Sequence, residues 1–294
     1  MEIFGIPHQA FLGQLMLGLV NGAFYAMLSL GLAVIFGLLD IVNFAHGALY
    51  MLGAFAAWIP LDRFGINFWL ALVLAPAIVG VLGVVIERLF LKRLYGLDPL
   101  YGLLLTFGLS LILEGVFRHY YGVSGQSYPV PELLSGATNL GFMILPNYRA
   151  FVVVASLVVC LGTWFLIERT RLGAYLRAGT ENSKLVQAFG VNVPLMVMLT
   201  YGAGAALAAM AGVLAAPIIQ VTPLMGSNLI IVVFAVVVIG GMGSILGSVV
   251  TGLGLGVIEG LTRVFYAEAS SVVVFVVMVI VLILRPAGLF GKEA

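Results

Sequence analysis

The chain has 294 residues, of which 63% are hydrophobic and only 9% carry a formal charge. A soluble domain is roughly 25% charged, so this composition predicts an all-α integral membrane protein and excludes a soluble enzyme. The net charge of +1 argues against nucleic acid as a partner. The single cysteine, Cys160, cannot form an intrachain disulfide. We expect one transmembrane domain over residues 1–294.

Nine apolar stretches follow one another along the chain, and a helix that crosses a bilayer needs about 20 mostly apolar residues. We therefore predict about eight or nine transmembrane helices. The seventh stretch is short, so it is predicted to be a span or, alternatively, a half-helix or re-entrant segment. The stretches cover residues 10–37, 44–61, 67–91, 100–120, 149–167, 192–216, 228–241, 246–266 and 270–285.

Lysine and arginine residues are concentrated at one set of predicted helix ends. Cytoplasmic loops are enriched in these residues, and placing residues 168–191 in the cytoplasm puts nine basic residues inside and four outside. This distribution predicts an N-terminus outside and a C-terminus in the cytoplasm. Residues 121–148 then form the main external loop, whose glycines and prolines indicate a compact lid.

Three polar side chains interrupt the apolar pattern between the first two stretches, namely Asp40, Asn43 and His46. Asn43 can act as the N-cap of the second helix. Alternatively, the three residues line a water-filled translocation path, since polar groups inside membranes are costly and often functional. No second His or Cys stands at ligand spacing, so no metal site is predicted.

Two segments far apart in the chain match at a constant offset, Gly96–Tyr121 and Gly241–Tyr266. The shared Glu-Gly-x-x-Arg pattern argues against a chance match, so stretches four–five and eight–nine are predicted to form an internal repeat in the same orientation. Within each repeat Glu and Arg are four residues apart and therefore side by side on a helix. We expect Glu114–Arg118 and Glu259–Arg263 to be structural ion pairs near the outer boundary.

A charged segment, residues 168–191, separates the fifth and sixth stretches. Thr180 is placed to cap a short helix, with Glu181 in its first turn and Gly190 at its end. Apolar residues recur at helical spacing within it. The segment is either an ordinary basic loop that orients the chain or a short amphipathic helix that docks another protein. The candidate docking residues are Arg177, Thr180, Glu181, Lys184, Leu185, Val186, Phe189 and Gly190.

Glycine is frequent, with 37 residues. Small residues let membrane helices pack closely, which is the simplest explanation. The alternative is that Gly240–Gly247 separates two half-helices at a conduction path. The residues assigned to this path, beside Asp40, Asn43 and His46, are Gly240, Gly241, Gly243 and Ser244.

Motifs for ATP hydrolysis and for common catalytic sites are missing from the sequence. No lysine stands in a G-x-x-x-x-G-K phosphate-binding loop, and no H-E-x-x-H, G-x-S-x-G or C-x-x-C pattern occurs. We therefore expect a transport protein that is not an enzyme and binds no cofactor of its own.

Four segments carry a resemblance to a known family: Gly18–Ala54, Arg177–Asn192, Gly240–Gly247 and Leu284–Gly291. They resemble the LivH-type permeases, which are membrane subunits of branched-chain amino-acid ABC importers. The run Asn43–Gly47 is the most specific part of this match. The resemblance covers nearly the whole chain and implies a permease of the type II ABC importer class in the bacterial inner membrane.

The resemblance also implies partners and an energy source. These are a second, LivM-like permease, two cytoplasmic ATPases that hold ATP and magnesium, and a periplasmic substrate-binding protein. It assigns residues 168–191 to ATPase coupling, and leucine, isoleucine or valine as the substrate. Urea and short-amide ABC permeases are an alternative within the family. An ATP-independent channel or carrier is an alternative from another class, and the lack of an unpaired intramembrane charge argues against ion coupling.

Overall fold

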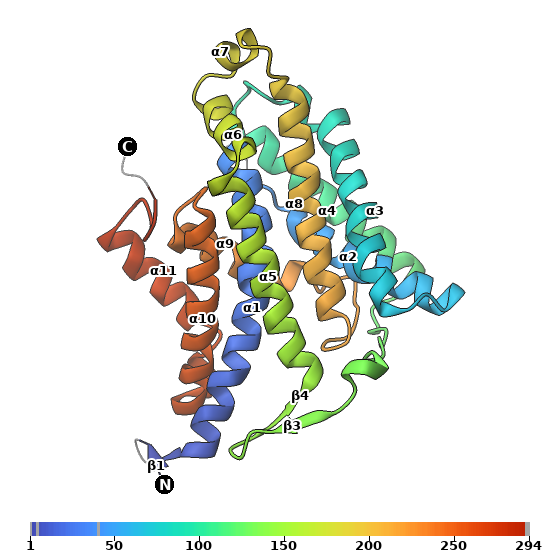
Figure 1. Ribbon diagram of the computed structural model, residues 1–294, viewed down its shortest axis with the longest axis vertical. Coiled ribbons are helices and arrows are strands. Elements are labelled where there is room, and N and C mark those ends of the chain that lie inside the picture. The colour runs from blue at the N-terminus through green and yellow to red at the C-terminus, as the bar shows by residue number, and fades with distance from the viewer. Residues whose placement is uncertain (1, 4–5, 40–41, 292–294) are drawn as a thin grey trace.

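The computed structural model describes residues 2–3, 6–39 and 42–291, and it confirms the all-helical prediction (Figure 1). Nine of the eleven α-helices in these residues overlap the nine predicted stretches, and α6 and α7 lie in the charged segment. The helices are α1 (His8–Leu39), α2 (Ala45–Phe64), α3 (Phe68–Leu89), α4 (Pro99–Tyr121), α5 (Asn147–Arg169), α6 (Arg171–Glu181), α7 (Ser183–Ala188), α8 (Val193–Ala215), α9 (Ser227–Gly240), α10 (Ile245–Phe265) and α11 (Val273–Leu284).

Short elements connect the helices. Two small antiparallel sheets are formed by β1 (Glu2–Ile3) with β2 (Ile6–Pro7) and by β3 (Ala137–Asn139) with β4 (Ile144–Pro146). Single 3-10 turns are η1 (Leu91–Arg93), η2 (Glu132–Leu134) and η3 (Ala267–Ala269).

Helix length separates the described helices into two groups. By length and composition α1, α3, α4, α5, α8 and α10 can each cross a membrane, whereas α9 and α11 are apolar but shorter. The 14 residues of α9 extend about 21 Å at the helical rise per residue. This is about two thirds of the roughly 30 Å of a bilayer core, so the seventh stretch forms a helix too short to cross it.

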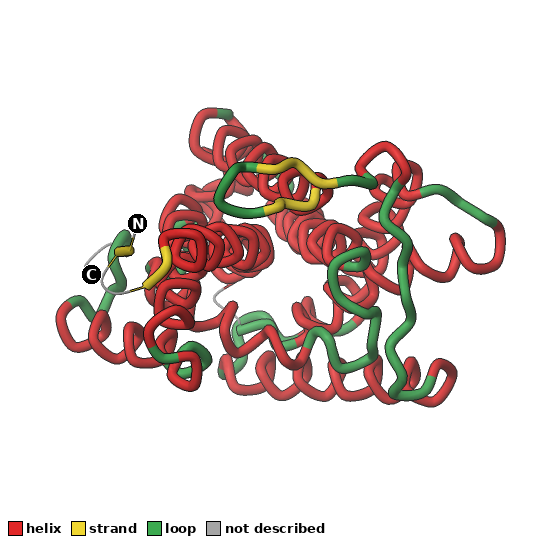
Figure 2. The backbone as a smooth tube through the Cα atoms, turned by 90° about the horizontal axis from the view of Figure 1, so that it is seen from below, coloured by secondary structure: helices red, strands yellow, loops and turns green. Residues whose placement is uncertain are grey.

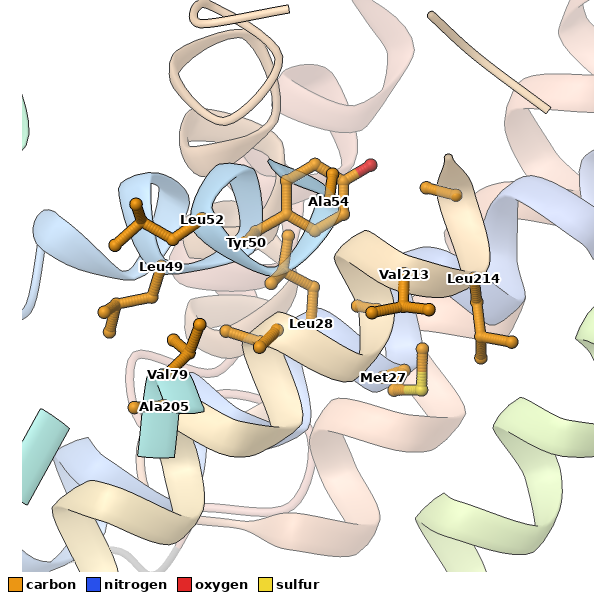
Figure 3. Packing of buried hydrophobic residues seen from close by; sticks show 14 of the residues in the cluster. Met27, Leu28, Leu49, Tyr50, Leu52, Ala54, Val79, Ala205, Val213 and Leu214 are labelled. Atoms are coloured by element: carbon orange, nitrogen blue, oxygen red, sulfur yellow. The ribbon is translucent and has the colours of Figure 1, made fainter. Parts of the chain in front are cut away.

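The core of the bundle is formed by α1, α2, α3 and α8. Figure 3 shows Met27 and Leu28 of α1 beside Val213 of α8, and Leu49 of α2 above Val79 of α3. The centre of α2 is buried on all sides, although α2 is not among the six helices that length and composition mark as membrane spans. Protein therefore surrounds α2 where lipid would surround an outer helix.

Glycines bring α1 and α10 into direct backbone contact. A Cβ on Gly18 would overlap the carbonyl of Gly256, and a Cβ on Gly256 would overlap the backbone of Gly22. Further along, Gly37 packs against Gly243 with its Cβ position 3.0 Å from the Gly243 Cα. The two antiparallel helices are therefore held together by close backbone packing, as the abundance of small residues predicted.

Two helices begin in the middle of the bundle. The imidazole of His46, in the first turn of α2, contacts the Leu28 carbonyl. Leu28 lies eleven residues before the end of α1, a distance of about 16 Å along the helix. Gly226, which precedes α9, packs directly on the backbone of Gly47. The first turns of α2 and α9 therefore meet halfway through the molecule.

The end of the molecule opposite α6 and α7 carries the long loop after α4. Figure 2, seen from that end, shows the β3–β4 hairpin lying across the helix ends. Gln126 pairs with Val221 through two backbone hydrogen bonds of 2.9 Å, which join this loop to the α8–α9 connection. Tyr128 is buried against Phe68. The loop is thus a packed cover, as its composition predicted.

The predicted repeat segments bury matching positions. One stripe of α4 and one stripe of α10 are buried, each at four-residue spacing. The buried residues are Gly102, Thr106, Ser110 and Glu114 in α4, and Gly247, Thr251, Leu255 and Glu259 among those in α10. The remaining surface of α4 is largely apolar and exposed.

Candidate functional site

The chain between α1 and α2 forms a buried turn at the centre of the bundle, which we call the central turn (residues 42–46). The amide of Phe44 donates to the Thr106 hydroxyl of α4 at 3.2 Å. The Phe44 ring stacks on Phe234 of α9 and meets Phe107 of α4 edge-on. Since α1 and α8 also contact this turn, four helices converge on it. Asp40 lies outside the described residues.

Asn43 is not the N-cap of α2, so that interpretation is wrong. The cap residue is Phe44, which makes no side-chain cap bond. Asn43 is only 1% exposed and its amide nitrogen donates to the Tyr201 hydroxyl of α8 at 3.1 Å. Its amide oxygen is buried and has no hydrogen-bond partner among the described residues. Asn43 therefore links the central turn to α8.

His46 is fully buried between α1 and α8. Its Nε2 lies 2.9 Å from the Leu28 carbonyl, and a carbonyl only accepts, so Nε2 carries the proton. Nδ1 is then an acceptor, and within the described part of the chain it has no partner. The central turn thus holds two buried acceptor atoms without a hydrogen-bond partner among the described residues, one on Asn43 and one on His46. Buried polar atoms without partners are costly and uncommon outside functional sites.

A cavity of about 1250 Å³ lies between the central turn and the α6–α7 end of the molecule. Gly102 of α4 and Val197 of α8 line its inner part. Each is one helical turn from a residue that holds the central turn, Thr106 and Tyr201 respectively. Thr180 and Ser183 line its outer part. The cavity therefore extends from the α6–α7 segment almost to the central turn.

The predicted glycine break is present between α9 and α10. Gly241 and Gly243 adopt positive φ angles of 98° and 82°, and Ser244 caps α10 by accepting from the Gly247 amide. Gly243 and Ser244 line the cavity. Gly240 and Gly241 instead pack against the C-terminal segment, whose Leu289 and Phe290 amides donate to the last carbonyls of α9. These two bonds end on Ile239 and Gly240.

A buried carboxylate also lines the cavity. Glu87 of α3 is 2% exposed, and its Oε1 accepts a 2.8 Å hydrogen bond from the Tyr95 hydroxyl. Burial and the Glu87 carboxylate raise the pKa of Tyr95 well above its ordinary value, so the phenol stays protonated and donates. Glu87 was not predicted as a site residue, because it stands beside Arg88 and resembles the polar end of a span.

The charged segment folds into two helices instead of one. Thr180 and Glu181 end α6, and the Thr180 hydroxyl donates to the Arg177 carbonyl, so Thr180 is not an N-cap. The N-cap of α7 is Asn182, whose side chain accepts from the Leu185 amide. The prediction was wrong here because either residue can cap a helix, and the chain continues α6 through Thr180.

Gly190 ends α7 as predicted. It has a φ of 85° and its amide donates to the Gln187 carbonyl, while the Val191 amide donates to Val186. These two bonds are the Schellman arrangement, which brings Val191 over Val186. Val186 is buried by it and offers no docking surface. Leu185 and Phe189 point outward, with 54% and 80% exposed.

Arg177 joins the charged segment to the preceding helix. Its guanidinium donates to the Ile167 carbonyl at 3.0 Å and pairs with Glu168 at 3.4 Å. Arg177 therefore fixes α6 against the end of α5, while Lys184 is exposed on α7.

One of the two predicted ion pairs is present. Arg263 donates to Glu259 at 2.7 Å, and the Tyr25 hydroxyl of α1 donates to the other oxygen of Glu259 at 2.7 Å. Glu114 and Arg118 are both described and form no ion pair within 4.0 Å. Glu114 accepts from Ser110 instead, and Arg118 is exposed. Helical spacing permits the second pair, but the Glu114 side chain turns inward.

Across residues 2–3, 6–39 and 42–291, no group of three or more His, Cys, Asp or Glu side chains is placed to hold a metal ion. Cys160 is buried in α5. The polar groups of the central turn and the cavity suit passage of a polar molecule.

Comparison with known proteins gives the family. The family described as branched-chain amino acid transport system, permease component, matches residues 14–282. The chain is 31% identical to the high-affinity branched-chain amino acid transport system permease BraD of Pseudomonas aeruginosa, over 96% of each chain. It is 29% identical to the corresponding LivH permease of Escherichia coli and to that of Salmonella typhimurium, again over 96% of each chain.

No solved structure matches the chain at a significant level. The match to the family and its relatives extends through the central turn, the cavity walls and the α6–α7 segment. The chain therefore belongs to the permease components of branched-chain amino acid transport systems, a non-catalytic family of multi-pass membrane proteins.

Proposed function

We propose that this chain is one permease half of an ATP-driven importer that moves leucine, isoleucine and valine into the cytoplasm. The observation that carries the proposal is the cavity that extends to within about one helical turn of the residues that hold the central turn. It is open at the α6–α7 end of the protein and is closed at the other end by the central turn. This is the shape that an alternating-access path has when it faces one compartment.

The central turn acts as the gate of this path. It is held by single hydrogen bonds, from Asn43 to Tyr201 and from Phe44 to Thr106, and by aromatic contacts with α4 and α9. Such contacts are individually worth about 0.5–1.5 kcal/mol, so relative movement of α4 and α8 can release them. The two buried acceptor atoms of Asn43 and His46 can then receive a donor from the passing substrate.

The α6–α7 segment passes the motion of two ATPase subunits to the gate. Leu185 and Phe189 are exposed apolar residues on this segment, and Thr180 and Ser183 line the cavity. Movement of the segment therefore changes the cavity wall directly. The chain has no phosphate-binding loop, so the energy comes from partner subunits, beside a second permease and a periplasmic binding protein.

Topology completes the proposal. With α2, α9 and α11 counted as membrane elements, the chain has nine, its N-terminus is outside and its C-terminus is in the cytoplasm of the inner membrane. The α4–α5 and α10–α11 pairs form a structural repeat, which is supported by their matching buried stripes. This organisation is that of a type II ABC importer permease.

The function is tested by reconstitution in proteoliposomes. We expect the chain with its ATPases, second permease and binding protein to accumulate leucine when ATP is supplied, and the chain alone to accumulate none. Urea and short amides serve as competing substrates. Accumulation of leucine by the chain alone, or preferential uptake of urea by the complete system, would contradict the proposal.

Coupling is tested at Phe189, because exposed aromatic residues that fill partner pockets dominate interface energies. Phe189→Ala should cost about 2 kcal/mol or more of ATPase binding, or uncouple ATP hydrolysis from uptake. Lys184→Ala is the control, since it removes an exposed charge from the same helix. The readouts are co-purification of the ATPases and leucine uptake. Full retention of both by Phe189→Ala would make the segment an ordinary orienting loop.

A further inference from the structure

Glu87 is a buried carboxyl group in the wall of the cavity. It belongs to α3, is 2% exposed and lines the cavity together with its partner Tyr95. A carboxylate removed from water loses much of its hydration, so it is retained in buried positions only where something compensates it. Its surroundings therefore indicate what kind of group it is placed to meet.

Among the described residues no cation pairs with Glu87. Ion pairs within 4.0 Å join Arg263 to Glu259 and Arg177 to Glu168, and Lys92 lines the same cavity beyond that distance from Glu87. The hydrogen bond that Glu87 has is from the neutral hydroxyl of Tyr95. This bond fixes one carboxylate oxygen and leaves the negative charge unbalanced. The expectation that the predicted spans hold no unpaired charge is therefore wrong at this position.

Glu87 is also next to the gate. One helical turn before Glu87 in α3, the Cβ position of Gly83 lies 3.6 Å from the Tyr201 ring, and the Tyr201 hydroxyl holds Asn43 of the central turn. A molecule that passes the central turn toward the α6–α7 end therefore meets Glu87 at the start of the cavity.

Two other carboxylates line the cavity, and each is compensated locally. Asp98 accepts from the Leu100 amide at the start of α4, where the helix dipole favours a negative charge. Glu168 pairs with Arg177 at 3.4 Å. The other walls carry positive charge, from Lys92 and from the first turns of α8 and α10.

We infer that Glu87, positioned by Tyr95, is a transient site for the α-ammonium group of the amino acid as it leaves the central turn. The inference rests on the proposed function and deepens it. The ammonium group supplies the cation that Glu87 lacks, and the substrate carboxylate is directed to the positive walls. A neutral amide or urea supplies no such charge, so the site selects a zwitterion or a cation.

The first experiment uses the wild-type importer complex in detergent. Glu87 is labelled with dicyclohexylcarbodiimide, and modification of the Glu87 peptide is measured by mass spectrometry. Millimolar leucine or leucinamide, which carry an ammonium group, should lower labelling at least about threefold. The matched probes 4-methylpentanoate and 4-methylpentanamide, which lack it, should not. Equal labelling with all four would overturn the inference.

The second experiment measures leucine uptake by reconstituted variants. Glu87→Gln removes the charge and keeps the shape, and should lower the maximal uptake rate about tenfold while the complex still assembles. Tyr95→Phe should lower it less, because the carboxylate remains. Glu132→Gln, at an exposed carboxylate in the external loop, should have no effect.

The outcomes separate this inference from the proposed function. Leucine uptake by the wild type that Glu87→Gln leaves unchanged would overturn the ammonium site and keep the function. Absence of leucine uptake by the wild-type complex would contradict the function itself. If the Glu87→Gln complex fails to assemble, the carbodiimide labelling of wild-type Glu87 with and without the ammonium compounds still tests the inference.

Discussion

The buried carboxylates of this protein are each held by a hydroxyl group. Tyr95 donates to Glu87, Tyr25 donates to Glu259, and Ser110 donates to Glu114. A hydroxyl satisfies one oxygen without neutralising the charge, so the three sites differ in what else is near. Arg263 completes the Glu259 site, whereas neither Glu87 nor Glu114 has an ion-pair partner within 4.0 Å in the described residues.

This difference predicts how the two arginines of the repeat respond to mutation. Arg263→Ala leaves Glu259 with Tyr25 alone and should lower the free energy of unfolding by about 1–3 kcal/mol, given that the Arg263 side chain is itself 40% exposed. The double change Glu259→Ala with Arg263→Ala should recover part of the loss. Arg118→Ala is the control and should change little. Thermal unfolding of the purified protein gives the measurement, and equal losses in the single and double variants would argue against the pair.

The central turn depends on the bond between Asn43 and Tyr201. Tyr201→Phe keeps the buried volume and removes the acceptor, which should weaken the closed gate by about 1 kcal/mol or more. That corresponds to a change of about fivefold or more in a gating equilibrium, so the uptake rate should change while the complex remains assembled. Tyr128→Phe is the control, because its buried hydroxyl has no partner among the described residues. Unchanged uptake would mean that this bond does not hold the gate, and loss of the complex would give it a packing role.

At the scale of elements, two helix pairs differ in how they pack. The antiparallel helices α1 and α10 pack closely along their length, whereas α2 and α9 meet only at their first turns. At Gly18, Gly22 and Gly256 no side chain separates α1 from α10, so the two backbones touch there. In contrast, α2 and α9 both begin at the centre, where Gly47 meets Gly226. Helix ends that meet inside a bundle can rotate more easily than full-length helices, because a shorter packed surface has to separate.

Two glycines of α10 provide a matched test of the close pair. A Cβ at Gly256 overlaps Gly22, whereas a Cβ at Gly254 has nothing within 4 Å. Gly256→Ala should therefore push α1 from α10 and lower the unfolding temperature. Gly254→Ala should be neutral or stabilising by up to about 1 kcal/mol, because alanine favours helix. The measurement is the unfolding temperature of each variant. Similar values for the two variants would mean that α1 and α10 can separate without a cost in stability.

For the whole molecule, one end is open and the other is covered. The cavity is lined by residues of α4, α6, α7 and α8, while the β3–β4 hairpin and the packed loop between α4 and α5 cover the opposite end (Figure 2). An importer in this arrangement faces the cytoplasm if α6 and α7 are on that side. The orientation proposed from the lysine and arginine distribution agrees with this interpretation.

Cysteine labelling tests the orientation of the molecule and its cavity. In a Cys160→Ser background, Ser183→Cys lies at the cavity wall and Leu133→Cys in the loop between α4 and α5, where Leu133 is exposed. A membrane-impermeant maleimide should label Ser183→Cys in inside-out vesicles and Leu133→Cys in right-side-out vesicles. The reverse pattern would contradict the proposed topology.

The sequence by itself determined the apolar helices of this protein. Apolar stretches located all nine of these helices, because burial in lipid or protein requires continuous apolar segments. It also determined the glycine break before α10, the end of α7 at Gly190 and the family, since each depends on residues close together in the chain.

Only the tertiary structure decided which polar groups meet. Glu87, Tyr95 and Tyr201 look like span ends or aromatic spacers in sequence, and they become neighbours because α3 packs on α8 and the following loop folds back. The same holds for Asn43, which donates to Tyr201 of a distant helix while Phe44 takes the cap position of α2, and for Glu114, which accepts from Ser110 and forms no pair with Arg118. The spacing of residues along one helix limits which contacts are possible. The packing of distant helices then selects among these contacts, because each buried polar group bonds to the partner that the fold brings within reach.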